Sequence, residues 1–229
     1  MNKVAIIPAR AGSKRIPNKN IYDLHGLPLI AYTIRQAIEF GDFDAIYVNS
    51  DSGEILECAE KYGATPYQRP PELGLDTSRV LDVAKSQIKD INLKEHDELA
   101  LLLPTCPLRT CEDIRNAYNI FSINGKKRQV VSVTEYEKSP EQAFVVNSGF
   151  LVRQFPSVYS SRSQDHSASY RYNTAIIIST AKIFSEQSDI VGENSIPYIM
   201  PFERSIDIDY QYQMDMVECI MNNTKNISL

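Results

Sequence analysis

Residues 4–20 read VAIIPARAGSKRIPNKN, an apolar run followed by a loop rich in cations. The run at 4–9 is short and ends at Arg10 and Gly12, which is typical of a buried strand. The segment at 28–40, PLIAYTIRQAIEF, starts with proline and then places apolar residues at helical spacing. We therefore expect the chain to begin with a strand, a loop and a helix.

The same order of elements recurs along the chain. A second apolar run, AIYVNSD at 45–51, leads into SGEILECAEKYG, where Ser52 is a suitable N-cap and Gly63 a suitable helix end. Helix-like and strand-like segments then alternate at 79–91, 98–104, 111–125 and 129–135. Repeated βα units predict an α/β fold with a mostly parallel sheet and helices on both of its faces.

Residues 136–172 interrupt this alternation. They contain prolines, serines and two short strand-like runs around Ser148 and Gly149, without a strong helical period. The α/β pattern resumes with YNTAIIIST at 172–180 and ends in a helix that begins at Tyr210. A chain of 229 residues with 43% hydrophobic content can bury a substantial core, so we predict one domain over 1–229 with an inserted arm at 136–172.

Positive charge is concentrated at the N-terminus of an acidic chain. Residues 1–22 carry five cations and no acids, whereas the whole chain has a net charge of -5, so the remainder has 19 cations against 29 acids. A protein that binds nucleic acid over a broad surface is usually basic overall. The distribution predicts a compact anionic ligand and no nucleic-acid partner.

The remaining composition favours a cytoplasmic protein without a structural metal site. The N-terminal apolar run has six residues, far fewer than a signal peptide or a membrane span needs. The four cysteines lack paired CxxC spacing and the three histidines lie far apart, so neither set predicts a zinc site. We expect free thiols, a cytoplasmic location and no membrane partner.

The cationic loop after the first strand is suited to binding phosphate. In open α/β sheets this loop lies at the edge where ligands bind, and small residues at 11–13 allow backbone amides to approach phosphate oxygens. Arg and Lys add charge-assisted hydrogen bonds, and the loop contains Arg10, Lys14, Arg15 and Lys19. It matches neither GxxxxGK[ST] nor GxGxxG. A nucleoside triphosphate is the expected ligand, and a solvated basic loop is the alternative.

Two carboxylates near the C-terminus are candidates to hold a divalent cation. In SIDIDY at 205–210, Asp207 and Asp209 are separated by one residue, so in an extended segment they point to the same side. Carboxylate oxygens are ligands for hard cations such as Mg²⁺, which often accompany triphosphates. The alternative is a pair of surface acids at a helix N-terminus.

Five segments together resemble the acylneuraminate cytidylyltransferases, the CMP-sialic acid synthetases. They are PARAGSKRIPNKN (8–20), RPPELGLDTS (69–78), LLLPTCPLRT (101–110), RSQDHSASYRYNTAIII (162–178) and PYIMPFERSIDID (197–209). The resemblance spans residue 1 to about 221. It implies a Rossmann-like nucleotidyltransferase domain that uses CTP and Mg²⁺ to make a CMP-sugar and pyrophosphate.

The resemblance also implies roles for individual residues. The phosphates would be contacted by Arg10, Ser13 and Lys19, and cytosine would be read with the help of Asn20. The nucleotide pocket would be completed by Arg69 and Ser78. Asp207 and Asp209 would bind Mg²⁺. Arg162 would contact either the acidic keto sugar or the developing phosphate charge. Asn173 would hydrogen-bond the sugar, at a position that Leu103 also lines. Of these, Arg10, Lys19, Arg162 and the two aspartates would be catalytic.

Several positions depart from the family pattern and leave the sugar open. Leu103 stands where relatives often have Gln, and further departures occur at Val80, Cys106, Ser163 and Thr174. Because a site built to hydrogen-bond a substrate discriminates strongly, loss of Gln favours an acid sugar other than N-acetylneuraminate. KRIP at 14–17 is closer to pseudaminic-acid enzymes, whereas the RSQD and YNTA segments are closer to the sialic and legionaminic branches. Kdo is a further alternative, and a non-catalytic nucleotide-sugar-binding homologue is an alternative of another class.

The resemblance finally implies a homodimer. Relatives are dimers in which the arm packs on the partner and helps to close its active site. The arm would then bury its aromatic residues, which are Tyr136, Phe144, Phe150, Phe155 and Tyr159. The alternative is that these aromatics cover the core of their own chain. A pair with twofold symmetry is the simplest closed arrangement.

Overall fold

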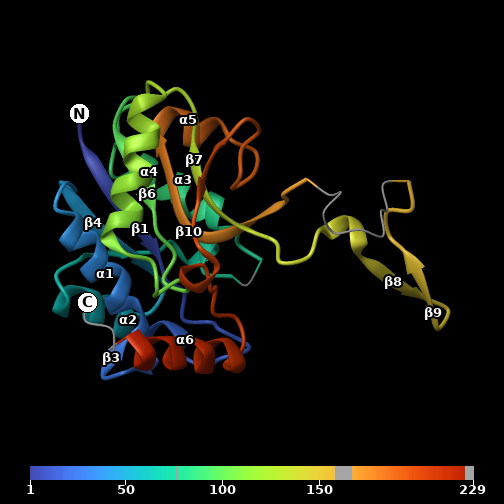
Figure 1. The fold of residues 1–229 in the computed structure, drawn as a ribbon. Coiled ribbons are helices and arrows are strands. Elements are labelled where there is room, and N and C mark those ends of the chain that lie inside the picture. Colours follow the sequence, from blue (N-terminus) through green and yellow to red (C-terminus); the bar gives the residue numbers. More distant parts are fainter. Residues whose placement is uncertain (76, 158–166, 225–229) are drawn as a thin grey trace.

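The computed structural model describes residues 1–75, 77–157 and 167–224 of the chain. Its body is a seven-stranded sheet with helices packed on it, and an arm projects from one side (Figure 1). The strand order is β11-β7-β10-β6-β1-β4-β5. These strands are β1 (Lys3–Pro8), β4 (Ala45–Ser50), β5 (Thr65–Gln68), β6 (Glu98–Leu101), β7 (Val130–Glu135), β10 (Tyr170–Thr180) and β11 (Ile196–Ile199).

The sheet is mostly parallel, as predicted. β1 pairs in parallel with both β4 and β6, and parallel pairs also join β4 to β5 and β7 to β11. β10 is antiparallel to both of its neighbours, β6 and β7. Parallel strands place their carboxyl ends at one edge of the sheet, so the loops after β1, β5 and β6 meet there.

Helices cover both faces of the sheet, which confirms the predicted fold class. The helices are α1 (Leu29–Phe40), α2 (Gly53–Lys61), α3 (Val80–Asp90), α4 (Cys111–Ile123), α5 (Ala181–Glu186) and α6 (Gln211–Thr224). Successive side chains of β1 point to opposite faces: Ala5 and Ile7 join the core with α1, α2 and α4, whereas Val4 and Ile6 join the core with α3 and α5. Both cores consist mainly of buried aliphatic side chains, together with aromatic residues such as Phe121 and Phe184.

A third apolar cluster attaches the C-terminal segment to the body. Ile206, Ile208 and α6 residues including Met214 pack with Ile16 of the cationic loop and Leu29 of α1. Helix α6 lies along the base of the body in Figure 1. This packing brings the SIDID segment against the loop after β1 although the two are almost a full chain length apart.

β10 contains an irregularity close to the site. Its register against β7 shifts between Tyr172 and Ile177, and Thr174 adopts a left-handed conformation with φ 62°. A residue other than glycine pays a steric penalty in that region, so the surrounding hydrogen bonds must hold it there. The strand is therefore irregular just beyond the carboxyl end of β6, where Ile177 is opposite Leu101.

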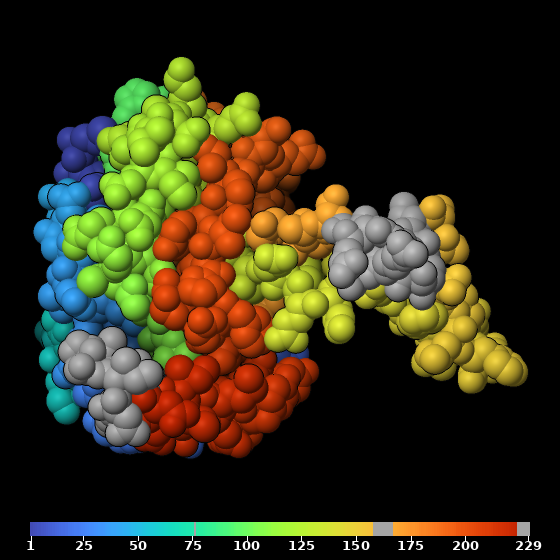
Figure 2. All heavy atoms as spheres, in the orientation of Figure 1, coloured from blue at the N-terminus to red at the C-terminus, as the bar shows by residue number. Residues whose placement is uncertain are grey.

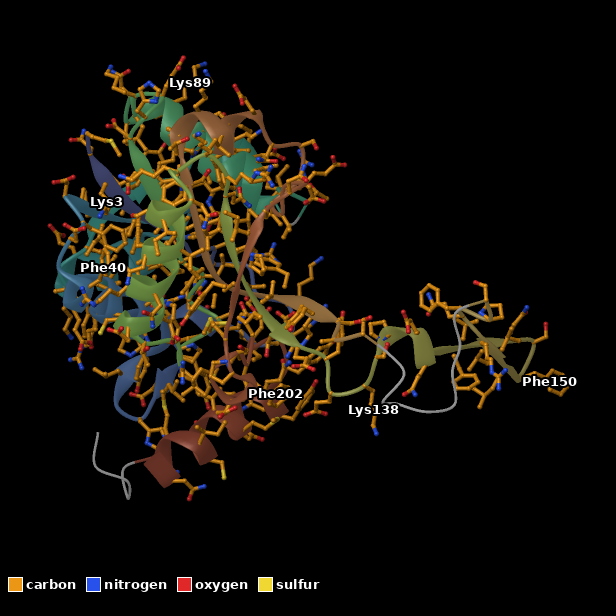
Figure 3. The ribbon with its side chains drawn as sticks, turned by 45° about the horizontal axis from the view of Figure 1, so that its top comes forward. Lys3, Phe40, Lys89, Lys138, Phe150 and Phe202 are labelled. Carbon is orange, nitrogen blue, oxygen red and sulfur yellow. The ribbon has the colours of Figure 1, made fainter. Side chains whose placement is uncertain are left out.

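The arm is built around a hairpin of β8 (Phe144–Asn147) and β9 (Phe150–Arg153). Ser148 and Gly149 form its turn, both with positive φ, which matches the twist of a two-residue hairpin. Figure 2 shows the arm standing clear of the body, and Figure 3 places Lys138 near its start and Phe150 at its far end. β10 begins at Tyr170, three residues inside the range predicted for the arm, because residues 170–172 pair with β7.

Smaller elements complete the described fold. Two short strands, β2 (Asp23–Leu24) and β3 (Leu27–Pro28), form a separate hairpin before α1. Single turns of 3₁₀ helix occur at Lys19–Ile21, Pro71–Leu73, Pro140–Gln142 and Phe202–Arg204. Within the described ranges, no helix combines the length and the apolar character needed to cross a bilayer.

Candidate active site

A cavity of about 420 Å³ opens at the carboxyl edge of the sheet. Its walls come from the loops after β1, β5 and β6, the start of α3 and the segment before α6. Nine residues predicted as site residues line it: Arg10, Ser13, Lys19, Asn20, Arg69, Ser78, Leu103, Asp207 and Asp209. Lys14, Arg15, Val80 and Thr105 are among the other lining residues. Arg162 lies outside the described residues.

Hydrogen bonds fix the cationic loop from within and from the residue that follows β4. The Asn20 side-chain amide donates to the carbonyl of Arg10 at 2.8 Å, and the amide of Ala11 donates to Asp51 at 2.9 Å. Asn18 takes a left-handed conformation immediately before the 3₁₀ turn that carries Lys19 and Asn20. These contacts fix the loop at the wall of the cavity that its cations line.

Lys19 and Arg15 both contact Asp209. Lys19 Nζ lies 3.2 Å from Asp209 Oδ1 and donates to the Ile208 carbonyl at 2.5 Å, while Arg15 Nη1 lies 2.9 Å from Asp209 Oδ2. The Arg15 guanidinium also stacks over the ring of Tyr210, 4.6 Å from its centroid. Arg15 belongs to the predicted phosphate loop but not to the predicted site residues. Its contact with Asp209, 194 positions away, has no local signal in the sequence.

Asp207 occupies a more buried position than Asp209. Burial raises the pKa of its carboxyl group, the neighbouring Asp209 carboxylate raises it further, and Thr105 and Lys19 oppose the shift. The amide of Ile208 donates to the Thr105 carbonyl at 2.9 Å, which anchors the segment to the loop after β6. Residues 205–209 have no regular secondary structure, yet both aspartates reach the cavity.

The two aspartates fit a Mg²⁺ site that shares its cation with a phosphate ligand. The described residues contain no cluster of three or more His, Cys, Asp or Glu side chains. Mg²⁺ is commonly held by one or two carboxylates and completed by phosphate oxygens and water. Asp207 and Asp209 supply two such carboxylates, and Lys19 and Arg15 contact Asp209 in the same cavity.

Arg69 is buried at the back of the cavity. Its Nε donates to Asn49 Oδ1 at 2.7 Å and its Nη2 to the Asn49 carbonyl at 3.0 Å, and Asn49 in turn donates to Gln87 at 2.9 Å. Burial lowers the pKa of Arg69, an effect that the Asp51 carboxylate opposes. Arg69 thus lines the site from a rigid position between β4 and α3. Ser78 stands at the exposed rim, where its hydroxyl contacts the Glu72 carbonyl at 3.5 Å.

Asn173 is not brought to either cavity described for this chain. Its side chain is fully buried, accepts from Ser132 at 2.6 Å and donates to Ser205 at 2.8 Å. The Cys106 thiol donates to the Asn173 carbonyl at 3.0 Å. In this arrangement the Asn173 side chain stabilises the irregular part of β10. Its neighbour Thr174, and not Asn173, lines a cavity.

Arg109 is a buried cation beneath the site that the sequence patterns did not single out. Only 1% of its surface is exposed. Nη1 donates to the Ala175 carbonyl at 2.6 Å, and Nη2 donates to Thr33 at 2.8 Å and to Gln36 at 2.9 Å. Burial lowers the pKa of Arg109 to about 10. The side chain ties the loop after β6 to β10 and α1, and its signal in the sequence is a charge inside the otherwise uncharged stretch 99–111.

A second buried charge anchors the segment that carries the aspartates. Asp113 begins α4 in a capping box with Thr110 and accepts two bonds from Arg204, at 3.0 and 2.8 Å, and one from Tyr198 at 2.7 Å. Burial alone would raise the pKa of Asp113, but these hydrogen bonds outweigh it and lower the pKa. Arg204 lies three residues before Asp207, so this ion pair fixes the start of the SIDID segment.

We expect Asp113→Asn to destabilise the fold by about 1.5–3 kcal/mol at neutral pH, because it weakens the charge-assisted hydrogen bonds from Arg204. The native pKa of Asp113 is below its ordinary value of 3.8, so its stabilisation is present above that pH and is lost as pH falls through the native pKa. Urea unfolding should therefore show a difference from wild type that narrows below pH 3.8. Glu112→Gln, at the adjacent exposed acid, is the matched control. A constant difference across this pH range would contradict the ion-pair explanation.

A second cavity of about 290 Å³ adjoins the first. Val80 and Leu103 line both cavities. The other lining residues are Arg79, Leu81, Tyr172, Thr174, Asp189 and Ile190. Leu103, predicted as a sugar contact, therefore stands at the boundary between a polar, charged cavity and a second space behind it.

Solved structures with the same architecture are nucleotidyltransferases. The structure titled CMP:2-keto-3-deoxy-manno-octonic acid synthetase complexed with CTP matches with a TM-score of 0.74 at 15% identity, covering 98% of this chain and 100% of the other. A 4-diphosphocytidyl-2C-methyl-D-erythritol synthase from Anaerococcus prevotii matches with a TM-score of 0.66 at 14% identity, covering 96% and 98%. At such low identities the likeness shows the fold alone, which is that of Rossmann-like nucleotidyltransferases.

Sequence comparison defines the family. The Cytidylyltransferase family model matches residues 4–186. A pseudaminic acid cytidylyltransferase of Campylobacter jejuni (strain 81-176) is 34% identical over 224 residues, covering 96% of each chain. The CMP-N,N'-diacetyllegionaminic acid synthase of Legionella pneumophila is 36% identical, covering 96% of this chain and 97% of the other, and the N-acylneuraminate cytidylyltransferase of Escherichia coli is 32% identical, covering 99% and 54%. The chain therefore belongs to the cytidylyltransferase family, which confirms the resemblance found in the sequence.

Proposed function

We propose that this protein transfers CMP from CTP to an acidic 2-keto-3-deoxy sugar of the nonulosonic class and releases pyrophosphate. The observation that carries the proposal is one cavity in which the cationic loop after β1 faces Asp207 and Asp209. Phosphoryl-type transfer asks a protein mainly to align the reactants and to neutralise charge, and this cavity offers groups for both tasks.

The reaction forms one bond to phosphorus and breaks another. The anomeric hydroxyl oxygen of the sugar attacks the α-phosphorus of CTP, the bond from that phosphorus to the pyrophosphate oxygen breaks, and the hydroxyl proton is released to solvent. In this proposal Lys19 and Arg10 bind phosphate oxygens, Arg69 and Ser78 complete the nucleotide pocket, and Asn20 helps to read cytosine. What supports these roles is that all five residues line the same cavity. Asp207 and Asp209 would hold Mg²⁺, which, when bound, neutralises phosphate charge and lowers the pKa of the attacking hydroxyl.

The test is pyrophosphate release from CTP with a panel of acid sugars. The panel contains pseudaminic, legionaminic and N-acetylneuraminic acids together with Kdo, since relatives and structural neighbours carry these specificities in their names. We expect release with at least one nonulosonic acid and none without a sugar. No release with any of them would contradict the proposal and favour a nucleotide-sugar-binding protein without catalysis.

We propose further that two chains associate through the arm. The hairpin leaves large apolar side chains in solvent, with Phe150 75% and Leu151 73% exposed. Exposed apolar surface of this kind is characteristic of an interaction site. A second copy of the chain is a suitable partner for this apolar surface, because a pair with twofold symmetry buries both hairpins at once.

Light scattering at micromolar concentration should then give twice the chain mass of 25.9 kDa. Replacing Phe150 and Leu151 with serine should shift the protein toward monomer, because it removes apolar area without altering the body of the fold. Val191→Ser, at an exposed apolar residue of the body, is the control and should leave the mass unchanged. A wild-type monomer would contradict this assembly.

A further inference from the structure

The irregular part of β10 contains backbone amides that the regular ladder with β7 does not pair. The register breaks within residues 172–177, where Ser132 of β7 alone faces the interval. A buried amide without a hydrogen-bond partner is costly. The Ser132 hydroxyl accepts from the amide of Ile176 at 2.7 Å, and Asn173 Oδ1 accepts from the amide of Ala175 at 3.3 Å. Two side chains therefore replace the missing ladder bonds.

The same two side chains begin a hydrogen-bonded network that leaves the sheet. The Ser132 hydroxyl donates to Asn173 Oδ1 at 2.6 Å, and Asn173 Nδ2 donates to the Ser205 hydroxyl at 2.8 Å. The Ser205 hydroxyl then donates to the Pro201 carbonyl at 2.8 Å. All three side chains are fully buried, so water does not compete for these bonds. Buried networks in which every member is satisfied make a structure rigid.

The network ends at the start of the segment that carries the two aspartates. Ser205 lies two residues before Asp207, and residues 205–209 have no regular secondary structure. Ile206 and Ile208 of this segment pack into the apolar cluster with α6, whereas Asp207 and Asp209 line the first cavity. Because the segment has no ladder of its own, its position depends on side-chain and loop contacts such as that of Ser205.

We propose that Asn173 acts through Ser205 to position Asp207, so that the network fixes the aspartate segment relative to β7 and β10. The inference rests on the proposed function, in which Asp207 holds Mg²⁺, and it gives Asn173 a role other than the sugar contact expected from the sequence. Groups that orient a metal ligand without touching the metal typically contribute about 10- to 100-fold to metal affinity or activity. Asn173 and Ser205 are thus positioning residues.

Ser205→Ala tests this role, because it removes the end of the network while Ser132 and Asn173 still satisfy the amides of β10. The Mg²⁺ concentration for half-maximal pyrophosphate release should rise by about tenfold or more, while KM for the acid sugar stays as in wild type. Without Mg²⁺ or CTP, the amides of residues 206–209 should exchange with deuterium faster than in wild type, while those of β1 remain protected.

Asn173→Ala should change both measurements in the same direction. Because Asn173 and Ser205 belong to one network, the double variant should lose less than the sum of the two single losses. The matched control is Ser179→Ala, at a fully buried serine of β10 whose hydroxyl has no partner among the described residues. It should leave the Mg²⁺ requirement and the exchange of residues 206–209 unchanged.

An unchanged Mg²⁺ requirement and unchanged exchange in Ser205→Ala would overturn the inference and leave the network a role in β10 alone. A rise in KM for the sugar in Asn173→Ala, without any effect of Ser205→Ala, would also overturn it and assign Asn173 to the sugar. Absence of pyrophosphate release by wild type with every sugar would overturn the proposed function. The exchange comparison would still decide whether the network orders the aspartate segment.

Discussion

Asp209→Asn should reduce kcat for pyrophosphate release by at least about 100-fold. Removal of one group that stabilises transition-state charge typically lowers kcat by about this factor. Asp209 lines the cavity, and its two carboxylate oxygens face Lys19 and Arg15. Neutralising it removes one of the two proposed Mg²⁺ ligands and leaves both cations without their partner. The fold should persist, because this carboxylate is half exposed and not part of a core.

Two measurements separate loss of the site from loss of the fold. Thermal unfolding of Asp209→Asn should resemble that of wild type, and calorimetric titration should show that Mg²⁺ no longer strengthens CTP binding. Asp215→Asn, at an exposed acid on α6 outside the cavity, is the matched control for a lost negative charge. Normal Mg²⁺-dependent turnover in Asp209→Asn would remove this residue from the proposed mechanism.

Lys19→Ala should lower kcat by about 30- to 1,000-fold, which corresponds to ~2–4 kcal/mol of lost transition-state stabilisation. Its ammonium group is largely buried, with 12% of the side chain exposed. After the substitution, water therefore compensates poorly for the lost interaction with phosphate charge. The same group holds the Ile208 carbonyl, and its loss therefore also loosens the segment between the two aspartates. Lys61→Ala, in the last turn of α2, is the control for removal of a lysine.

A double-mutant cycle tests whether Lys19 and Asp209 act together. Because the two side chains are in contact, Lys19→Ala should cost much less in the Asp209→Asn background than in wild type. Strictly additive effects on kcat would show that Lys19 acts independently of the carboxylate. Unchanged turnover in Lys19→Ala alone would show that it is a solvated lysine and that the cationic loop serves another purpose.

The fold class was predictable because each unit of the sheet has a local signal. Apolar runs such as 4–9 and 45–51 became β1 and β4, and Ser52 caps α2 as expected. The direction of β10 had no such signal, since an apolar strand has the same pattern whichever way it runs. Its antiparallel placement follows from the arm, which returns the chain beside β7.

The site was predictable where its charged residues lie close together in the sequence. The cationic loop and the two aspartates are of this kind, and the structure brings them to one cavity. The supporting charges were not predictable, because their partners lie far away in sequence: Arg109 reaches Ala175 over 66 residues and Arg204 reaches Asp113 over 91. Such pairs exist only after the sheet has formed.

The base of the arm has a consequence for how this architecture can change. Glu135 and Tyr170 are directly opposite one another in the ladder, and Tyr136 donates to the Ser169 carbonyl at 2.9 Å, so the two ends of the insertion are held together by the body. Any segment that can connect the neighbouring strands β7 and β10, even a tight turn, can therefore occupy this position in the chain. Closing a longer or shorter loop changes the free energy by only ~0.6 kcal/mol for each doubling of length. The length of the insertion can therefore change at this junction without disturbing the pairing of β7 with β10.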